Sequence, residues 1–213
     1  MPAPITHIVF AIHALKGPFY NKSPKKFIIG TCFPDIRYLV KIPRTVTHPE
    51  QKISIKMIKR EPSDFKAGWL FHCWLDQQRK FFFTHQKQLS PYEIKILRFR
   101  GAKIYEDILF YNDIRQWPTI IDYLNIIIPD EIRPKISLEN VQMWHNILQI
   151  YFEKQPQTTD ANSPITRILN PQQKAETKQH LETIKNSKKL IQVLWNFYEY
   201  IKKSLEDETT SLE

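Results

Sequence analysis

Glycine is scarce in this chain, whereas proline is common. The 213 residues include 4 glycines and 15 prolines. β-Barrels, P-loops and Rossmann turns need glycine where the backbone turns tightly or approaches a ligand, so the composition argues against all three. Proline is favoured at the first position of a helix, and Ser90-Pro91 and Asn170-Pro171 both follow that pattern. The composition therefore favours a helical protein.

Cysteine is also scarce, with only Cys32 and Cys73. Two cysteines can form neither a disulfide framework nor a CxxC zinc ribbon. Cys73 follows His72 in an apolar stretch, which predicts a buried and reduced thiol. A reduced thiol fits the cytoplasm best, although secretion by a signal-free route would leave the same pattern.

The chain lacks a long apolar run. A membrane-spanning helix needs about 20 apolar residues, but the longest run, at 120–128, is interrupted by Asp122, Tyr123 and Asn125. The N-terminal segment has no basic region, and His7 and His13 interrupt its apolar part. We therefore predict that the chain has neither a transmembrane segment nor a signal peptide. We also predict that the protein is cytoplasmic.

The formal net charge is +9. Lysine and arginine are scattered along the chain and not gathered in one stripe. A basic surface concentrates anions such as phosphates, phospholipid headgroups or nucleic acid. It also serves simply to keep a protein soluble, and the sequence leaves both interpretations open.

Residues 64–85 form the most apolar stretch, with aromatic side chains on nearly every face of a predicted helix. A helix of this kind is normally buried in the middle of a domain. It nevertheless carries His72 and Asp76, whose four-residue spacing places them on one face, one turn apart. Burying both requires a partner for each, which is either a shared metal ion or a direct hydrogen bond between them.

The rest of the chain also predicts helices. Apolar periodicity and N-capping residues indicate helices over residues 4–15, 90–112, 117–128 and 137–154, and a short helical or strand-like piece at 53–58. The polar stretch 155–163 is predicted to be a linker, and residues 164–213 a helical hairpin with a polar, frayed tail from Glu206. We therefore predict an all-α domain with a metal site within residues 1–154, and a C-terminal hairpin on the same core.

Three further residues are candidate metal ligands. His7 lies on the flank of the apolar stripe of its helix, where it could point into a cleft. Asp35 follows Pro34 and is either a helix N-cap or a ligand. His48 lies in a basic loop, where a histidine is more often an ordinary surface residue.

Taken in order, these residues resemble the zinc-dependent phospholipase C family, whose fold is similar to that of the P1-type nucleases. The resemblance rests on a THxxF segment at 6–10, a GxxxPD segment at 30–35, a loop histidine at 47–48 and a GxxxHxxxD helix at 68–76. These segments fall within residues 4–85, less than half of the chain.

The resemblance implies a cleft between helices that holds zinc ions. One site would be formed by Asp35, His48, His72 and Asp76, and a second by His7 with a shared Asp76. The family's third site uses an HxxxE pair that this chain lacks, because Gln149 follows His145 at that spacing. His85, Glu106 and Asp107 are candidate substitutes, although Glu106 and Asp107 would also fit a solvated helical edge.

Two functions are therefore expected. The first is a zinc-dependent phosphodiester hydrolase, phospholipase C-like, in which Asp35 or Asp76 acts both as ligand and as base. Its substrate would be a phospholipid headgroup or a nucleotide. If the substrate is a phospholipid, we expect peripheral contact with an anionic membrane. The second is a non-catalytic helical interaction protein that retains a structural metal or a buried His/Asp network.

Overall fold

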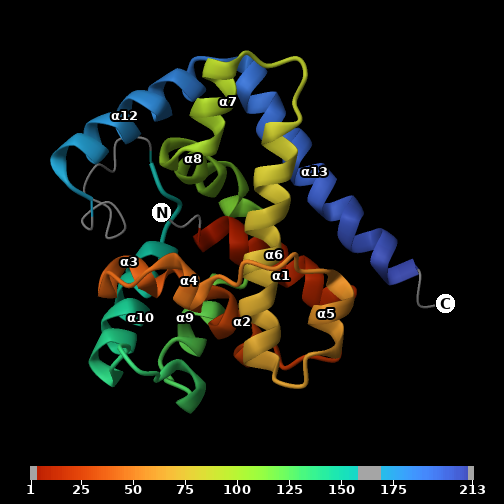
Figure 1. Cartoon of the computed structure of the whole chain (residues 1–213), viewed down its shortest axis with the longest axis vertical. Coiled ribbons are helices and arrows are strands. Elements are labelled where there is room, and N and C mark those ends of the chain that lie inside the picture. Colours follow the sequence, from red (N-terminus) through yellow and green to blue (C-terminus); the bar gives the residue numbers. More distant parts are fainter. Residues whose placement is uncertain (1–3, 158–168, 211–213) are drawn as a thin grey trace.

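A computed structural model describes residues 4–157 and 169–210. These residues form helices joined by turns, and their only β-type pairing is one isolated bridge between Arg133 and Ile136 (Figure 1). The prediction of an all-α protein is confirmed. None of the described helices is both long and apolar enough to cross a membrane.

Helix α6 (Asp64–Thr84) runs through the middle of the molecule (Figure 1). It begins where the Ser63 side chain accepts a hydrogen bond from the Lys66 amide, as an N-cap should. Helices α1 (Pro4–Lys16), α2 (Pro24–Cys32) and α5 (Ile55–Arg60) pack against it, and so do α7 (Pro91–Arg98) and α13 (Lys188–Thr210). The predicted central helix is therefore confirmed.

The packing of α2 on α6 is unusually close because each helix has a glycine at the crossing. A Cβ atom on Gly30 would lie 2.0 Å from the carbonyl oxygen of Phe65, and one on Gly68 would lie 2.0 Å from that of Phe27. Any larger residue would push the two backbones apart. The crossing sets the distance between His72 on α6 and Asp35, which follows α2.

The segment between α2 and α6 consists of short helices. They are η1 (Phe33–Ile36), α3 (Arg37–Val40), α4 (Arg44–Thr47) and α5. Asp35 thus lies inside a 3-10 helix, and His48 directly follows α4. The short piece expected at 53–58 is helical from Ile55, and its helix, α5, ends at Arg60.

The helix predicted over residues 90–112 is divided in two. Its capping box, formed by Ser90 and Glu93, opens α7 as expected. The backbone becomes extended at Phe99, and a second helix, α8 (Arg100–Phe110), follows. The chain continues through η2 (Tyr111–Asp113), α9 (Trp117–Tyr123), η3 (Pro129–Glu131) and α10 (Leu138–Phe152).

The C-terminal hairpin consists of α12 (Pro171–Lys185) and α13. Helix α12 packs on α8, and α13 packs on α1 and α6. The expected fraying from Glu206 is wrong, because α13 continues through Thr210. Most of the predicted linker at 155–163, and the first residues of the hairpin predicted from residue 164, lie outside the described residues.

Candidate metal centre

Five predicted ligands converge on one buried place in the fold. Among the described residues, two groups offer nitrogen and oxygen atoms that all lie within 4.8 Å of one another. The first group is His7, His72 and Asp76, and the second is Asp35, His48 and His72. They come from α1, η1, the residue after α4, and α6, so residues distant in sequence meet at α6.

Two of the histidines are oriented by hydrogen bonds to Nδ1. The Nδ1 atom of His72 lies 2.9 Å from the carbonyl oxygen of Thr31, and that of His48 lies 2.9 Å from Oγ1 of Thr47. A carbonyl oxygen can only accept, so His72 carries its proton on Nδ1 and leaves Nε2 with a free lone pair. Metal-binding histidines are usually held in this way.

The Nε2 atoms of His48 and His72 face carboxylates without hydrogen-bonding to them. His48 Nε2 lies 3.6 Å from Asp76 Oδ2, and His72 Nε2 lies 3.7 Å from Asp35 Oδ2. Both nitrogens are buried and lack a hydrogen-bond partner among the described residues. Two atoms each about 2.0–2.1 Å from a tetrahedral zinc ion lie about 3.3–3.4 Å apart, so the observed spacings suit an ion between them after a small contraction.

His72 occupies the middle of the cluster. Its ring stacks on that of His7 at 4.0 Å between centroids and meets that of His48 edge-on at 5.3 Å. Burial, together with the neighbouring His7, lowers the pKa of His72 well below its ordinary value. His72 is therefore neutral at neutral pH, which is the form that can bind a metal ion.

Both carboxylates are ionised. Burial by itself raises the pKa of Asp35, but nearby positive charge, that of Lys103 included, outweighs it and lowers that pKa. Burial acts in the same direction on Asp76, but Lys103 and His48 hold the pKa of this carboxyl well below its ordinary value. Two negative charges thus stand beside the neutral His72, a donor set that suits zinc.

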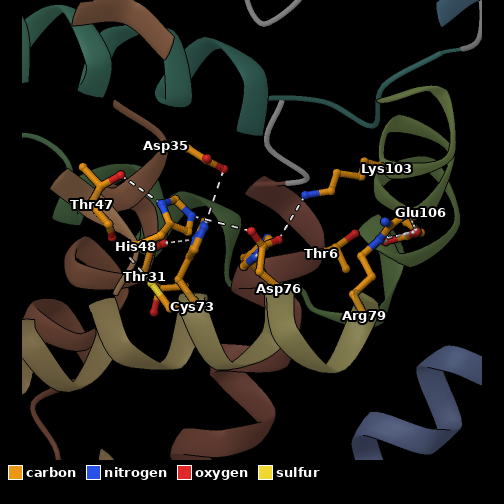
Figure 2. A network of polar contacts seen from close by, with 12 residues as sticks. Thr6, Thr31, Asp35, Thr47, His48, Cys73, Asp76, Arg79, Lys103 and Glu106 are labelled. Atoms are coloured by element: carbon orange, nitrogen blue, oxygen red, sulfur yellow. Dashed lines mark hydrogen bonds and ion pairs between the residues drawn. The ribbon is translucent and has the colours of Figure 1, made fainter. Parts of the chain in front are cut away.

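Two cations that the sequence analysis did not identify contact Asp76. The Nζ atom of Lys103 lies 3.0 Å from Oδ1 (Figure 2). Nη2 of Arg44 lies 2.8 Å from Oδ2. They lie 27 and 32 residues from Asp76 in sequence, so no local pattern could have revealed them. The two cations balance the two carboxylates, and a metal ion at Asp76 would have to compete with them.

The two ligand groups share His72. Because its Nδ1 is bonded to Thr31, His72 offers a single nitrogen, which can bind one ion at a time. The described residues therefore support one ion bound through His72, either with His7 and Asp76 or with Asp35 and His48.

The structure does not bring His85, Glu106 or Asp107 into this cluster. His85 is exposed, and its Nδ1 lies 2.8 Å from the carbonyl oxygen of Phe81 in the last turn of α6. Glu106 accepts hydrogen bonds from Arg79 further along α6 (Figure 2). Asp107 also has hydrogen-bond partners outside the cluster. The positions of His85, Glu106 and Asp107 therefore do not support the prediction that they form a third metal site.

Glu106 and Asp107 are also not a solvated helical edge, because both are fully buried and that interpretation is wrong. Asp107 accepts hydrogen bonds from the Thr6 amide and hydroxyl, each at 2.7 Å, and from the Tyr151 hydroxyl at 3.0 Å. It thereby ties α1 to α10. Both carboxylates are parts of the packed core.

His145 has an acidic partner that its sequence neighbours did not indicate. Gln149 stands where an HxxxE motif would have a glutamate, but Glu131 contacts His145 from an earlier element, at 2.7 Å from Nε2. The other ring nitrogen lies 2.9 Å from the carbonyl oxygen of Leu124. His145 is therefore a buried histidine with both ring nitrogens partnered.

A pocket of about 540 Å³ opens beside the cluster. Its lining includes His48 and Asp76 from the cluster, Arg44 and Lys103, which contact Asp76, and the Cys73 thiol. Burial raises the pKa of Cys73 well above its ordinary value, so this thiol stays protonated. The cluster can be reached from solvent through this pocket.

No known family profile, curated protein or solved structure matches this chain.

Proposed function

We propose that this protein is a metal-dependent phosphodiester hydrolase of the phospholipase C-like kind, with zinc as its ion. The observation that carries the proposal is the pair of buried Nε2 atoms on His48 and His72, which face carboxylates at 3.6 and 3.7 Å without hydrogen-bonding to them. Leaving such atoms without a partner is costly in a protein interior, and an ion between nitrogen and oxygen would remove that cost.

Asp35, His48 and His72 would hold the ion, together with Asp76 or in exchange with the group that includes His7. When bound, zinc polarises a phosphoryl oxygen and acidifies a water molecule. This chemistry would occur at the end of a pocket large enough for a small substrate.

Asp76 is the better placed of the two candidate bases. It lines the pocket, whereas Asp35 is not among the lining residues. Its two oxygens are held by Lys103 and Arg44, so the carboxylate has a fixed orientation from which to take a proton from an attacking water. The same two cations would attract the phosphate oxygens of a substrate toward Asp76.

One observation favours a second function, that of a non-catalytic helical interaction protein with a buried His/Asp network. Arg44 and Lys103 already neutralise Asp76, so the cluster has no excess negative charge without an ion. A cluster of this kind could serve stability alone, although the Nε2 atoms of His48 and His72 would then remain without partners.

Hydrolysis of bis(p-nitrophenyl) phosphate in the presence of zinc separates the two. A hydrolase should lose turnover by about 100-fold or more in Asp76→Asn, because general-base catalysis contributes about 10²–10⁴-fold. The matched control is Asp130→Asn, an exposed aspartate. Unchanged turnover in folded Asp76→Asn would contradict the role of Asp76, and a wild type without any turnover would favour the non-catalytic function.

A further inference from the structure

The pocket beside Asp76 is lined by more basic side chains than acidic ones. Five basic side chains line it, against the acidic Glu50 and Asp76. Arg79 is neutralised by Glu106, and Arg44 and Lys103 hold Asp76. The remaining two cations are Lys80 and Arg98, both exposed and without an ion pair within the described parts of the chain.

Lys80 and Arg98 lie at a defined place relative to the cluster. Lys80 follows Asp76 by four residues on α6, so it is on the same face, about 6 Å further along the helix axis. Arg98 ends α7, which packs on α6, and both side chains line the same pocket as Asp76. The pocket therefore holds the paired charges at Asp76 and two further cations that have no ion pair among the described residues. Of these two, Lys80 lies one helical turn from Asp76.

The lining also lacks the groups that other phosphodiesters require. A choline headgroup is recognised by aromatic rings around its ammonium ion, and nucleobases stack on aromatic side chains. Among the described lining residues, the only ring of this type is the imidazole of His48, which is buried in the cluster. The excess charge is positive, which repels a choline ammonium and attracts a phosphate.

We infer that this pocket binds a phosphodiester whose headgroup carries a second phosphate, with Lys80 and Arg98 contacting that phosphate while the scissile diester lies against Asp76. The chemical class is a phosphorylated polyol headgroup, either free or attached to a lipid. As a statement about substrate this rests on the proposed hydrolase function. As a statement about binding it depends only on the pocket.

Binding to the metal-free full-length protein tests the pocket alone. We expect inositol 1,4-bisphosphate to bind at least tenfold more tightly than inositol 1-phosphate in calorimetry. Lys80→Ala/Arg98→Ala should abolish that preference. The control variant Lys178→Ala/Lys188→Ala removes the same charge from exposed positions in the C-terminal hairpin and should retain it. Equal affinity of the wild type for both ligands would overturn the inference, as would an unchanged preference in the pocket variant.

Turnover of the zinc-loaded protein tests the substrate class. Glycerophosphoinositol 4-phosphate should be hydrolysed with a lower KM than glycerophosphoinositol. The pocket variant should raise the KM for the phosphorylated diester about tenfold with little change in kcat. Faster cleavage of phosphatidylinositol 4-phosphate in mixed micelles would identify a lipid as the substrate. Faster cleavage of the soluble diester would identify the free headgroup diester as the substrate. If the protein prefers the bisphosphate but hydrolyses no diester, the hydrolase function is wrong and the proposed anion-binding pocket is retained. If it hydrolyses diesters without this preference, the proposed second phosphate site is wrong.

Discussion

The Nδ1 atom of His72 lies 2.9 Å from the carbonyl oxygen of Thr31, so helix α2 sets the orientation of a ring carried by α6. The Thr31 hydroxyl in turn donates to the carbonyl oxygens of Phe27, at 2.9 Å, and Gly68, at 3.3 Å. The close crossing of α2 and α6 and the direction of His72 Nε2 are therefore parts of one arrangement. Changes at the crossing should therefore shift the imidazole ring of His72.

Gly68→Ala should destabilise the protein by about 3 kcal/mol or more, at the upper end of the cost of overpacking, because the new Cβ meets a backbone carbonyl that cannot rotate away. Alanine in place of a helical glycine would otherwise stabilise by about 1 kcal/mol. Urea denaturation measures the difference.

Gly17→Ala is the matched control for this change. Its Cβ would lie 2.9 Å from the side-chain Oγ1 of Thr209, which can move, and at an ordinary contact distance of 3.6 Å from the carbonyl oxygen of His13. We expect it to change stability by less than about 1 kcal/mol. A Gly68→Ala protein as stable as the wild type would show that the two helices are not in direct backbone contact.

Glu106→Ala should cost about 3–5 kcal/mol, because it leaves Arg79 buried without its counterion. Replacing both members of the pair, in Arg79→Met/Glu106→Met, should recover at least half of that loss. Lys189→Ala is the control, since it breaks an exposed ion pair with Glu93 worth less than about 1 kcal/mol. A double variant as unstable as the single one would contradict this explanation.

Asp107 should make the protein less stable as the pH rises. Burial raises its pKa to about 7 from an ordinary 3.8, despite the hydrogen bonds from Thr6 and Tyr151. The folded state then holds a proton that the unfolded state releases between pH 4 and 7. The contribution of Asp107 is full below pH 4 and falls by up to about 1.4 kcal/mol per pH unit until pH 7.

Asp107→Asn removes the titrating proton while keeping an oxygen for Thr6. Urea denaturation from pH 4 to pH 8 should therefore show a smaller decline in stability for this variant than for the wild type. Parallel pH profiles for the two proteins would contradict the raised pKa.

Lys103→Met should increase zinc affinity about tenfold, which corresponds to about 1.4 kcal/mol. Lys103 lies 3.0 Å from Asp76 Oδ1 and repels a cation that approaches this oxygen. Competition with a fluorescent zinc chelator measures the affinity. Lys178→Met, on the exposed side of α12, should leave it unchanged, and weaker zinc binding by Lys103→Met would show that Lys103 supports the centre.

Helices were predictable from the sequence because their signals are local. The N-cap at Ser63, the capping box at Ser90 and the apolar faces all depend on residues within a few positions of one another. The break at Phe99 was missed because neither a proline nor a capping side chain marks it. The extent of α13 was missed because polar composition alone suggested an end at Glu206.

The members of the cluster were predictable from residue type, spacing and resemblance, whereas the residues around them were not. His72 and Asp76 are one turn apart on one helix, which a sequence shows directly. Arg44 and Lys103 meet Asp76 only because α4 and α8 are folded against α6, and Glu106 finds Arg79 for the same reason. Partners of this kind depend on the fold.

The central claim is that Asp35, His48 and His72 form a metal centre, and metal content tests it most directly. Protein purified without a metal-binding tag is analysed by mass spectrometry for the wild type, for His72→Ala and for His85→Ala, which makes the same change at an exposed position near the end of the same helix. We predict one equivalent of zinc in the wild type and in His85→Ala, and none in His72→Ala. A folded wild type that stays empty after incubation with zinc would contradict the claim and make the cluster a buried polar network.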